Sequence, residues 1–197
     1  MSTQKKGSIA FAVCGSFCTL DAALHAAEAL AAQGWELWPI MSFAAQQDTR
    51  FGTGKFWRDR LAALAGRPVL DTLQAVEPLG PKHMAQALVI APCTGATLAR
   101  LAAGLSDTPV TLAAKSLLRV GCPVLISVST NDGLGASGEN IARLYQRKRF
   151  YFVPYGQDDP AGKPNSLKAD LAQLPAALDA ALQHRQLQPV LLGQNRS

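Results

Sequence analysis

The sequence predicts a doubly wound α/β fold, in which helices cover both faces of a flavodoxin-like parallel sheet. Short, nearly continuous apolar runs alternate along the chain with segments whose apolar residues recur every three or four positions. Strands that read as unbroken apolar runs are typical of a parallel sheet buried on both faces. Right-handed crossovers between such strands place helices on each side, and the length of 197 residues suits flavodoxin-like strand order.

The apolar runs, rich in β-branched and aromatic residues, are the expected strands. In chain order they are Ile9–Val13, Glu36–Met41, Pro68–Leu70, Ala87–Ala91, Pro123–Ser127 and Phe150–Val153. The first run ends abruptly at Gly15 and Ser16, and a helical pattern begins a few residues later. This turn is either a plain strand-to-helix connection or one that aims a helix N-terminus at an anion.

Helical periodicity fills the intervals between the strands. The expected helices are Leu20–Gln33, Gly54–Ala65, Asp71–Val76, Thr97–Ala103, Val110–Arg119, Gly138–Arg147 and Ser166–Gln183. In the first helix, Leu20, Leu24, Ala27 and Leu30 lie on one stripe, and Gly34 is expected to end it.

Length and composition predict one domain over residues 1–197, with a flexible N-terminus at 1–6 and an extended tail at 187–197. Hydrophobic residues make up 48% and charged residues 17%, which excludes a disordered chain. No apolar run approaches the roughly 18 residues that span a bilayer, and no secretory signal is recognised, so we expect a cytoplasmic protein without membrane contact.

Cysteine spacing and charge exclude two further classes of site. Cys14, Cys18, Cys93 and Cys122 fit no zinc pattern, so we predict free thiols and no metal site. The net charge of +5 comes from scattered basic residues without interleaved aromatic residues, so no nucleic-acid partner is expected.

Small and hydroxyl-bearing residues follow four of the predicted strands. Ligands of open α/β sheets bind outside the carboxyl ends of the strands, where glycine allows close approach and hydroxyl groups donate to phosphate oxygens. Each turn alone is also explained by helix capping, but four turns at one edge indicate a phosphorylated cofactor. The candidate cofactor-binding residues are Gly15, Ser16, Thr19, Ser42, Pro92, Thr94, Gly95, Thr97, Ser129, Thr130 and Asn131.

The same turns favour FMN over a dinucleotide. Gly15 is followed by no Gly-x-Gly-x-x-Gly pattern, and no Walker loop is present. No acidic residue ends the second strand, where the chain reads Pro-Ile-Met-Ser-Phe, so a ribose hydroxyl lacks its usual acceptor. A mononucleotide needs one phosphate site and an apolar ring slot.

Four stretches resemble the B subunits of dipicolinate synthase, a family within the wider group of FMN-binding cysteine decarboxylases. They are CGSFCT, APCTGATLARLAAGLSDTPVTLAAKSLLR, NDGLG and YFVPYGQDDPAGKPNSL, and the resemblance runs from about Lys6 to Leu192. It implies a flavodoxin-like fold, bound FMN, and a homo-oligomer that is a trimer or a multiple. It also implies a partner, a dehydrogenase-like A subunit, which brings NADP. The pair would make dipicolinic acid from a hydroxylated tetrahydrodipicolinate in the mother cell of a spore-forming bacterium.

The resemblance places several of the candidate residues in the motifs of the FMN-binding group. Gly15 and Ser16 match its first phosphate turn and Ser42 its residue after the second strand. Three departures stand beside these matches. Ala96 replaces the usual Asn, Asn131 survives without its Pro-x-Met neighbours, and the loop after the second strand lacks the His of the decarboxylases. We therefore expect no oxidation of a cysteine thiol.

Arg50 and Asn131 are the candidate catalytic residues. A dicarboxylate substrate needs a bidentate cation, which the Arg50 guanidinium supplies, although a salt bridge with Asp48 explains Arg50 equally well. Further candidates are His83, Lys115, Lys163, Asp158 and Asp159, whereas Trp35, Trp38 and Trp57 are expected in the core or at a subunit interface. Two alternatives stay open: a stand-alone FMN-dependent decarboxylase or prenyltransferase, and a non-catalytic binding subunit.

Overall fold

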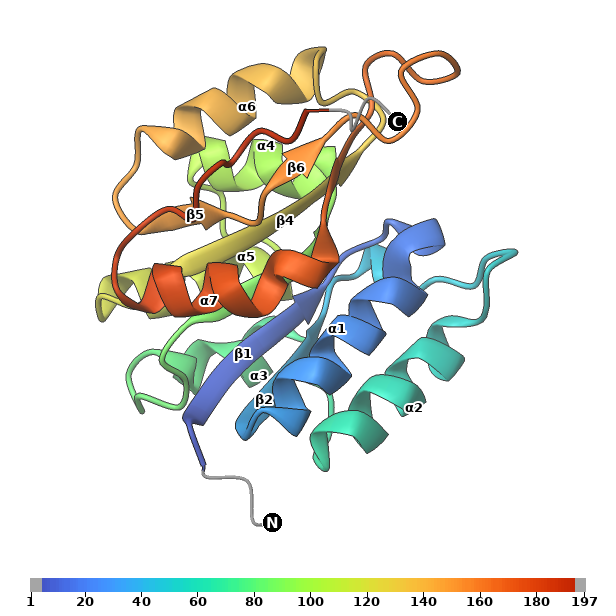
Figure 1. The fold of residues 1–197 in the computed structure, drawn as a ribbon. Helices are drawn as coiled ribbons and strands as arrows, with labels where there is room; N and C mark the ends of the chain where they lie inside the picture. Colours follow the sequence, from blue (N-terminus) through green and yellow to red (C-terminus); the bar gives the residue numbers. More distant parts are fainter. Residues whose placement is uncertain (1–4, 194–197) are drawn as a thin grey trace.

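The computed structural model describes residues 5–193 and is built on one seven-stranded sheet (Figure 1). The strand order is β2-β1-β3-β4-β7-β6, and β5 pairs with β4 beside this path. The bounds are β1 Gly7–Val13, β2 Trp35–Met41, β3 Leu88–Cys93, β4 Val124–Thr130, β5 Phe150–Phe152, β6 Tyr155–Gly156 and β7 Leu167–Ala169.

The parallel part of the sheet has the arrangement that the apolar runs predict. Strands β1 to β5 pair in parallel, with Ala10, for example, opposite both Trp38 and Leu88. Every residue of β3 is buried, because helices cover both faces of the sheet there. The flavodoxin-like α/β prediction is confirmed for this part of the chain.

Helices α1, α2 and α7 lie on one face of the sheet, and α3, α4 and α5 lie on the other, while α6 packs beside α4 (Figure 1). Their bounds are α1 Leu20–Ala32, α2 Gly54–Ala65, α3 Leu73–Val76, α4 Gly95–Ala103, α5 Pro109–Arg119, α6 Ala136–Tyr145 and α7 Leu174–Leu182. Short 3₁₀ turns at Phe17–Thr19 and Ala44–Gln46 follow β1 and β2.

Threonine side chains define where four of these helices begin. Thr53, Thr72, Thr94 and Thr108 each accept a hydrogen bond from the backbone N–H three residues later. Such caps satisfy a donor that has no partner within the helix. The expected helix at Asp71–Val76 therefore starts only at Leu73.

Two predicted elements differ from the structure. Residues 68–70 form no strand, because only Leu70 bonds to β2, accepting from Met41 and donating to Pro39. The expected helix at Ser166–Gln183 is wrong over its first third, where Leu167–Ala169 is β7, and α7 begins only at Leu174. Leu167 and Ala169 are buried while Lys168 is exposed, which is the alternation of a strand.

The β6–β7 hairpin also makes the sheet mixed rather than purely parallel. Strand β7 runs antiparallel to the end of β4 and to β6. A β-hairpin needs only a local turn, so antiparallel strands can extend a parallel sheet without another crossover helix. Residues 157–166 connect the two strands and lie at the upper right in Figure 1.

The C-terminal segment of the chain bonds to two edge strands of the sheet, β5 and β6. Gln186 uses its amide group to accept from the Phe152 N–H (2.8 Å) and to donate to the Phe152 carbonyl (2.7 Å). Tyr155 of β6 pairs with the C-terminal segment, donating to Val190 O and accepting from Leu192 N–H. The segment that follows α7 thus runs beside β6 and covers that margin of the sheet.

The two ends of the chain fall partly outside the described residues. Of the predicted flexible N-terminus, residues 1–4 lie outside, and Lys6 donates its N–H to the Gly34 carbonyl. Of the predicted tail, residues 194–197 lie outside. That residues 1–197 form one domain stays a prediction. Within residues 5–193, no helix is long and apolar enough to cross a membrane.

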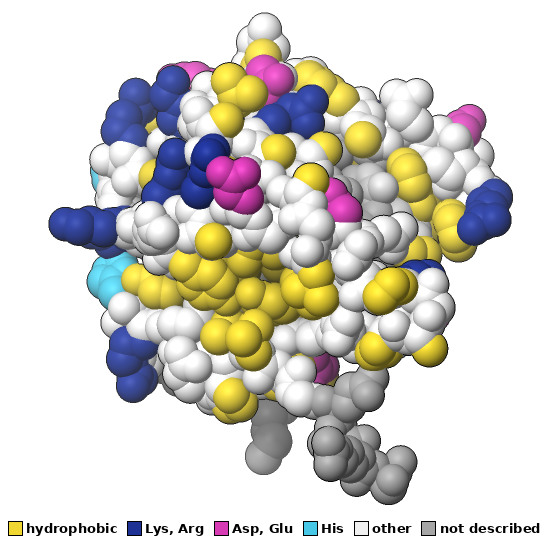
Figure 2. All heavy atoms as spheres, turned by 90° about the horizontal axis from the view of Figure 1, so that it is seen from above, with side chains coloured by type: hydrophobic (Ala, Val, Ile, Leu, Met, Phe, Trp, Pro, Cys, Tyr) yellow, Lys and Arg dark blue, Asp and Glu magenta, His cyan; other side chains and the backbone are white. Residues whose placement is uncertain are grey.

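Figure 2 shows the molecule of Figure 1 from above. This face has a broad apolar area at its centre, and Lys and Arg side chains gather along one side of it. Helix α6 and the C-terminal segment lie on this side of the molecule. Their large exposed apolar side chains are Tyr145 and Leu191. Contiguous apolar surface of this kind is typical of a protein–protein contact.

Candidate functional site

A cavity of about 680 Å³ lies at the carboxyl edge of the sheet, within the size range of small-molecule sites. It is bordered by the turns after β1, β3 and β4, by the loop between β2 and α2, and by the β6–β7 hairpin. The residues that line it are Gly15, Ser16, Phe17, Cys18, Thr19, Arg50, Phe51, Thr94, Gly95, Ser129, Thr130, Asn131, Asp158, Lys163, Ser166, Leu167 and Lys168.

Three of the predicted cofactor-binding residues do not line this cavity. Ser42 is buried, and its hydroxyl accepts a hydrogen bond from the Ala45 N–H (3.2 Å). Pro92 lies inside β3, where its carbonyl accepts from the Cys14 N–H (3.2 Å). Thr97 is buried within the first turn of α4. The other predicted residues, Arg50 and Asn131 included, are brought together around one space.

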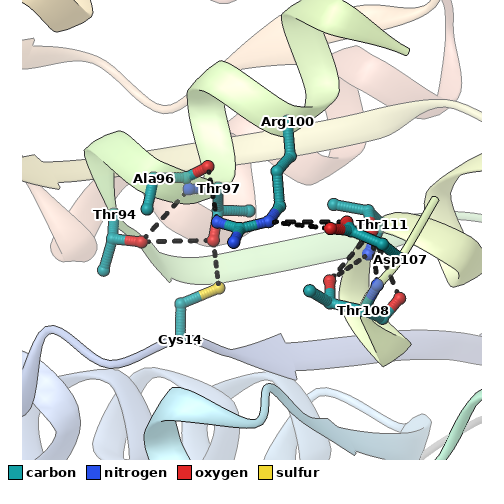
Figure 3. Close-up of polar contacts among 8 residues, drawn as sticks. All are labelled: Cys14, Thr94, Ala96, Thr97, Arg100, Asp107, Thr108 and Thr111. Carbon is teal, nitrogen blue, oxygen red and sulfur yellow. Dashed lines mark hydrogen bonds and ion pairs between the residues drawn. The ribbon is translucent and has the colours of Figure 1, made fainter. Parts of the chain in front are cut away.

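Thr97 belongs to a buried polar chain behind the cavity (Figure 3). Its hydroxyl donates to the Cys14 sulfur (3.3 Å), and its N–H donates to the Thr94 hydroxyl (3.3 Å). Burial raises the pKa of Cys14 to about 11, so this thiol stays protonated at neutral pH. Thr94 and Thr97 thus anchor the start of α4 to the end of β1.

Three hydroxyl groups form a compact cluster on the cavity wall, here called the hydroxyl trio. They belong to Ser16 and Thr19 of the turn after β1 and to Ser129 near the end of β4. The Ser16 and Ser129 oxygens are 2.9 Å apart, Thr19 lies 2.9 Å from Ser16, and Thr19 lies 3.3 Å from Ser129. The turn after β1 and the end of β4, which lie on either side of β3 in the sheet, bring Ser129 to Ser16 and Thr19 across more than a hundred positions of sequence.

The hydroxyl trio can spare one proton for a hydrogen bond to a ligand. Each hydroxyl supplies one donor, and the Thr19 hydroxyl also lies 2.8 Å from the Ser16 carbonyl, which can only accept. If Thr19 donates to that carbonyl, one of the two serines can donate its single proton to the other. The other serine then has a proton for a ligand in the cavity. The trio can therefore donate to an oxyanion.

A carboxylate lies beside the start of α4. Thr130 and Ser137 both donate to Oδ1 of Asp132, the latter at 2.7 Å. These two bonds lower the pKa of Asp132, which stays ionised. A Cβ on Gly95 would lie 2.5 Å from the Ser137 hydroxyl and 3.0 Å from this carboxylate oxygen. Asp132 thus brings negative charge to the helix end that was expected to face a phosphate.

The charged groups that line the cavity are Arg50, Lys163, Lys168 and Asp158. Among the described residues, none of the three cations lies within 4 Å of an acidic side chain. Asp48 does not pair with Arg50, because it accepts from the Gly54 N–H (2.9 Å), and the guanidinium lies 4.8 Å from the centre of the Phe51 ring. The site therefore has an excess of positive charge.

Asp158 is held within the hairpin. It accepts a 2.6 Å hydrogen bond from the Ser166 hydroxyl, which lowers its pKa, and the nearby Lys163 and Lys168 lower it further. Asp158 and Lys163 were sequence candidates, but the prediction of a helix from Ser166 hid Ser166, Leu167 and Lys168. The alternation Leu167-Lys168-Ala169 is the sequence signal that would have indicated a strand there.

The remaining candidates lie elsewhere. His83, Lys115, Asp159 and the three tryptophans are absent from the cavity lining. Trp35 and Trp57 are buried in the core and Trp38 packs against it, as expected.

The hydroxyl trio could hold the phosphate of FMN, whereas the start of α4 at Gly95 could not. The hydroxyl trio can donate to a phosphate oxygen, and Phe17, Phe51 and Leu167 supply apolar surface for a ring. A Cβ on Gly15 would lie 3.0 Å from the Ala44 Cβ, a tight contact, so glycine leaves this turn close to the cavity without crowding it. The Asp132 carboxylate disfavours a phosphate beside Gly95, since like charges repel. FMN therefore fits with its phosphate at the trio.

Cysteine alkylation tests this geometry. All four cysteines are free; Cys18 is exposed on the cavity wall, whereas Cys14 and Cys93 are fully buried with raised pKa values. Because the thiolate is the nucleophile, iodoacetamide at pH 8 is expected to modify Cys18 first and to reach Cys14 and Cys93 only after unfolding. Peptide mass spectrometry after short pulses measures the order. Equal rates for Cys14 and Cys18 would contradict the structure.

Comparison with known proteins shows the family to which the chain belongs. The flavoprotein family model matches residues 1–153. The B subunit of dipicolinate synthase from Bacillus subtilis (strain 168) is 42% identical over 193 residues, which are 98% of this chain and 96% of that protein. The crystal structure of the corresponding B subunit from Bacillus halodurans C is similar with a TM-score of 0.88 and 39% identity, covering 98% of this chain and 99% of that one.

A more distant likeness concerns the fold alone. The FMN-dependent cysteine decarboxylase SpaF has a TM-score of 0.68 at 21% identity, covering 91% of this chain and 97% of that chain. The family model ends at residue 153, before the β6–β7 hairpin, whereas both matches to dipicolinate synthase cover nearly the whole chain. The wall that the hairpin builds therefore lies outside the part matched by the family model.

Proposed function

The chain belongs to the flavoprotein family and, within it, to the B subunits of dipicolinate synthase, and from this membership we propose that it acts with an A subunit to form dipicolinate. The observation that supports this function is the cavity at the carboxyl edge of the sheet. Around one space it gathers three mutually bonded hydroxyl groups and three cations that have no ion-pair partner among residues 5–193. The hydroxyl groups suit a flavin phosphate, and the three cations suit a small molecule with two carboxylate groups.

The proposed reaction removes one water molecule, one hydride and one proton from a hydroxylated tetrahydrodipicolinate, which leaves the aromatic diacid. FMN, or NADP brought by the A subunit, would be the acceptor of that hydride. FMN, when bound, supplies a two-electron acceptor. The oxidoreductase role, the NADP and the mother-cell location, in the cytoplasm of a sporulating cell, are parts of this proposal.

Residues of this chain would bind and orient the substrate. Arg50 can bind one carboxylate through two parallel hydrogen bonds, since Asp48 accepts from the Gly54 N–H instead of pairing with Arg50. Asn131 lines the same cavity and can both donate and accept through its amide, which suits the ring substituents. Gly15, Ser16, Thr19, Ser129 and the start of α4 at Thr94 and Gly95 would hold the flavin. Ser42, Pro92 and Thr97 would support these turns from behind.

Reconstitution with the A subunit tests the function. We expect the pair to form dipicolinate, and we expect Arg50→Ala to lower kcat/KM roughly 10- to 100-fold, because charge-assisted bonds contribute about 1.5–3 kcal/mol. Arg185→Ala is the matched control, since the Arg185 side chain is exposed and, among the described residues, hydrogen-bonds only to Gln183. A pair that makes no dipicolinate would refute the proposal.

The absorption spectrum with and without added FMN separates the remaining roles. A yellow protein that is active without its partner would indicate a stand-alone decarboxylase or prenyltransferase. A colourless protein that turns over nothing, yet alters the activity of the A subunit, would indicate a non-catalytic binding role. We propose a homo-oligomer, a trimer or a multiple of it, for which the apolar area of Figure 2 offers a contact surface.

A further inference from the structure

The β6–β7 hairpin brings two lysines to a cavity whose other walls come from the parallel sheet. Its second strand places Lys168 directly opposite Ser129 and Leu167 opposite Thr130. Residues directly opposite in an antiparallel pair have their side chains on the same face. Lys168 therefore stands beside a member of the hydroxyl trio, and both side chains line the cavity.

The hairpin is packed firmly against the turn that follows β4. The Leu134 N–H donates to the Asn165 carbonyl (3.0 Å), and a Cβ on Gly133 would lie 2.5 Å from the Leu167 side chain. Within the hairpin, Lys163 N–H donates to the Asp159 carbonyl (2.7 Å), and Ser166 N–H donates to the Lys163 carbonyl (2.9 Å). Lys163 thus has an ordered backbone, which limits where its ammonium group can reach.

The acid that lines the cavity, Asp158, forms no ion pair with either lysine. Among the described residues, neither Lys163 nor Lys168 lies within 4 Å of a carboxylate, and Asp158 is engaged by the Ser166 hydroxyl. Two ammonium groups without an ion-pair partner among the described residues, facing one cavity, form a site for an oxyanion. Arg50 reaches the same cavity from the loop between β2 and α2, which Figure 1 shows as a separate segment from the hairpin.

We propose that Lys163 and Lys168 bind one carboxylate of a planar aromatic dicarboxylate while Arg50 binds the other, so that the hairpin selects dianionic over monoanionic ligands. This inference rests on the proposed function and adds to it the residues that recognise the second charge. A monocarboxylate can be held by only one of the two cationic groups. A ligand with carboxylates on both sides of a ring can contact the hairpin lysines and Arg50 at the same time.

Calorimetric titration with pyridine-2,6-dicarboxylate and pyridine-2-carboxylate tests the inference on the full chain. We expect the wild-type chain to prefer the dicarboxylate, and Lys163→Gln and Lys168→Gln each to weaken it about tenfold while changing the monocarboxylate less than twofold. Both lysines are exposed, so the variants should fold normally. Lys82→Gln, an exposed lysine outside the cavity, is the matched control and should change neither affinity.

Three results would overturn the inference. Equal losses of affinity for both pyridine ligands would show that the lysines do not recognise the second carboxylate. Loss of FMN affinity with unchanged dicarboxylate affinity would assign the lysines to the flavin phosphate. Absence of dicarboxylate binding to the wild-type chain would also refute it. Failure of the proposed function has a separate readout, because it is measured as dipicolinate made together with the A subunit.

Discussion

Phe152→Ala is expected to lower the free energy of unfolding by about 3–5 kcal/mol, because it removes a fully buried ring from the edge of the core. The Phe152 ring stacks on Tyr145 of α6, with centroids 4.2 Å apart, and lies 6.1 Å from the Tyr155 ring. Tyr145 donates to the Tyr155 hydroxyl at 3.2 Å. The cavity left behind would loosen the contact between α6 and the start of the hairpin.

Urea denaturation measures this loss of unfolding free energy directly. Thermal unfolding should show a drop in Tm of roughly 6–20 °C. Phe56→Ala is the matched control. Because the Phe56 side chain is 48% exposed, its removal should lower the free energy of unfolding much less. Equal destabilisation by the two substitutions would show that the stacking of Phe152 is not the source of its contribution.

Gly54→Ala is expected to destabilise the protein by about 3 kcal/mol through overpacking. A Cβ on Gly54 would overlap the carbonyl group of Gln46, so the short turn after β2 and the start of α2 could not both keep their positions. The Gly54 N–H also donates to Asp48 (2.9 Å), which anchors the loop that presents Arg50. The variant should therefore lose both stability and affinity for the dicarboxylate.

Gly104→Ala separates steric overlap from backbone strain. Gly104 ends α4 in the left-handed region with φ of 75°, and none of the described residues comes within 4 Å of a Cβ placed there. Alanine at this position should cost about 1 kcal/mol, which is the strain of that conformation alone. Thermal unfolding of the two variants compares the effects. A larger loss for Gly104→Ala would contradict the close contact between Gly54 and Gln46.

The parallel half of the fold could be predicted because each strand and helix there satisfies a local pattern. The run Ile9–Val13 is apolar throughout, as a strand between two helical layers must be, and Leu20, Leu24 and Leu30 form one buried stripe. The hairpin could not be predicted in the same way. Residues 167–169 become a strand only by pairing with the end of β4, and pairing between distant segments leaves little trace in local sequence.

Much of the candidate site followed from one rule, that ligands bind at the carboxyl ends of parallel strands. Ser16, Thr19 and Ser129 were found in this way, although their mutual hydrogen bonds depend on strand order and register. Ser42 and Thr97 have the same chemistry, yet the structure turns them toward Ala45 and Cys14. A hydroxyl that caps a turn and one that faces a cavity cannot be distinguished by residue type.

The Gln186 amide has a consequence for how this protein can assemble. An open strand edge invites another chain to continue the sheet, which can lead to uncontrolled polymerisation. Here Gln186 occupies both backbone groups of Phe152, Leu70 bonds to β2, and Val190 and Leu192 occupy those of Tyr155. Backbone positions on all three margins are already satisfied by the chain's own residues. Neighbouring molecules should therefore meet it through side-chain surfaces, which permit closed, symmetric assemblies of defined size.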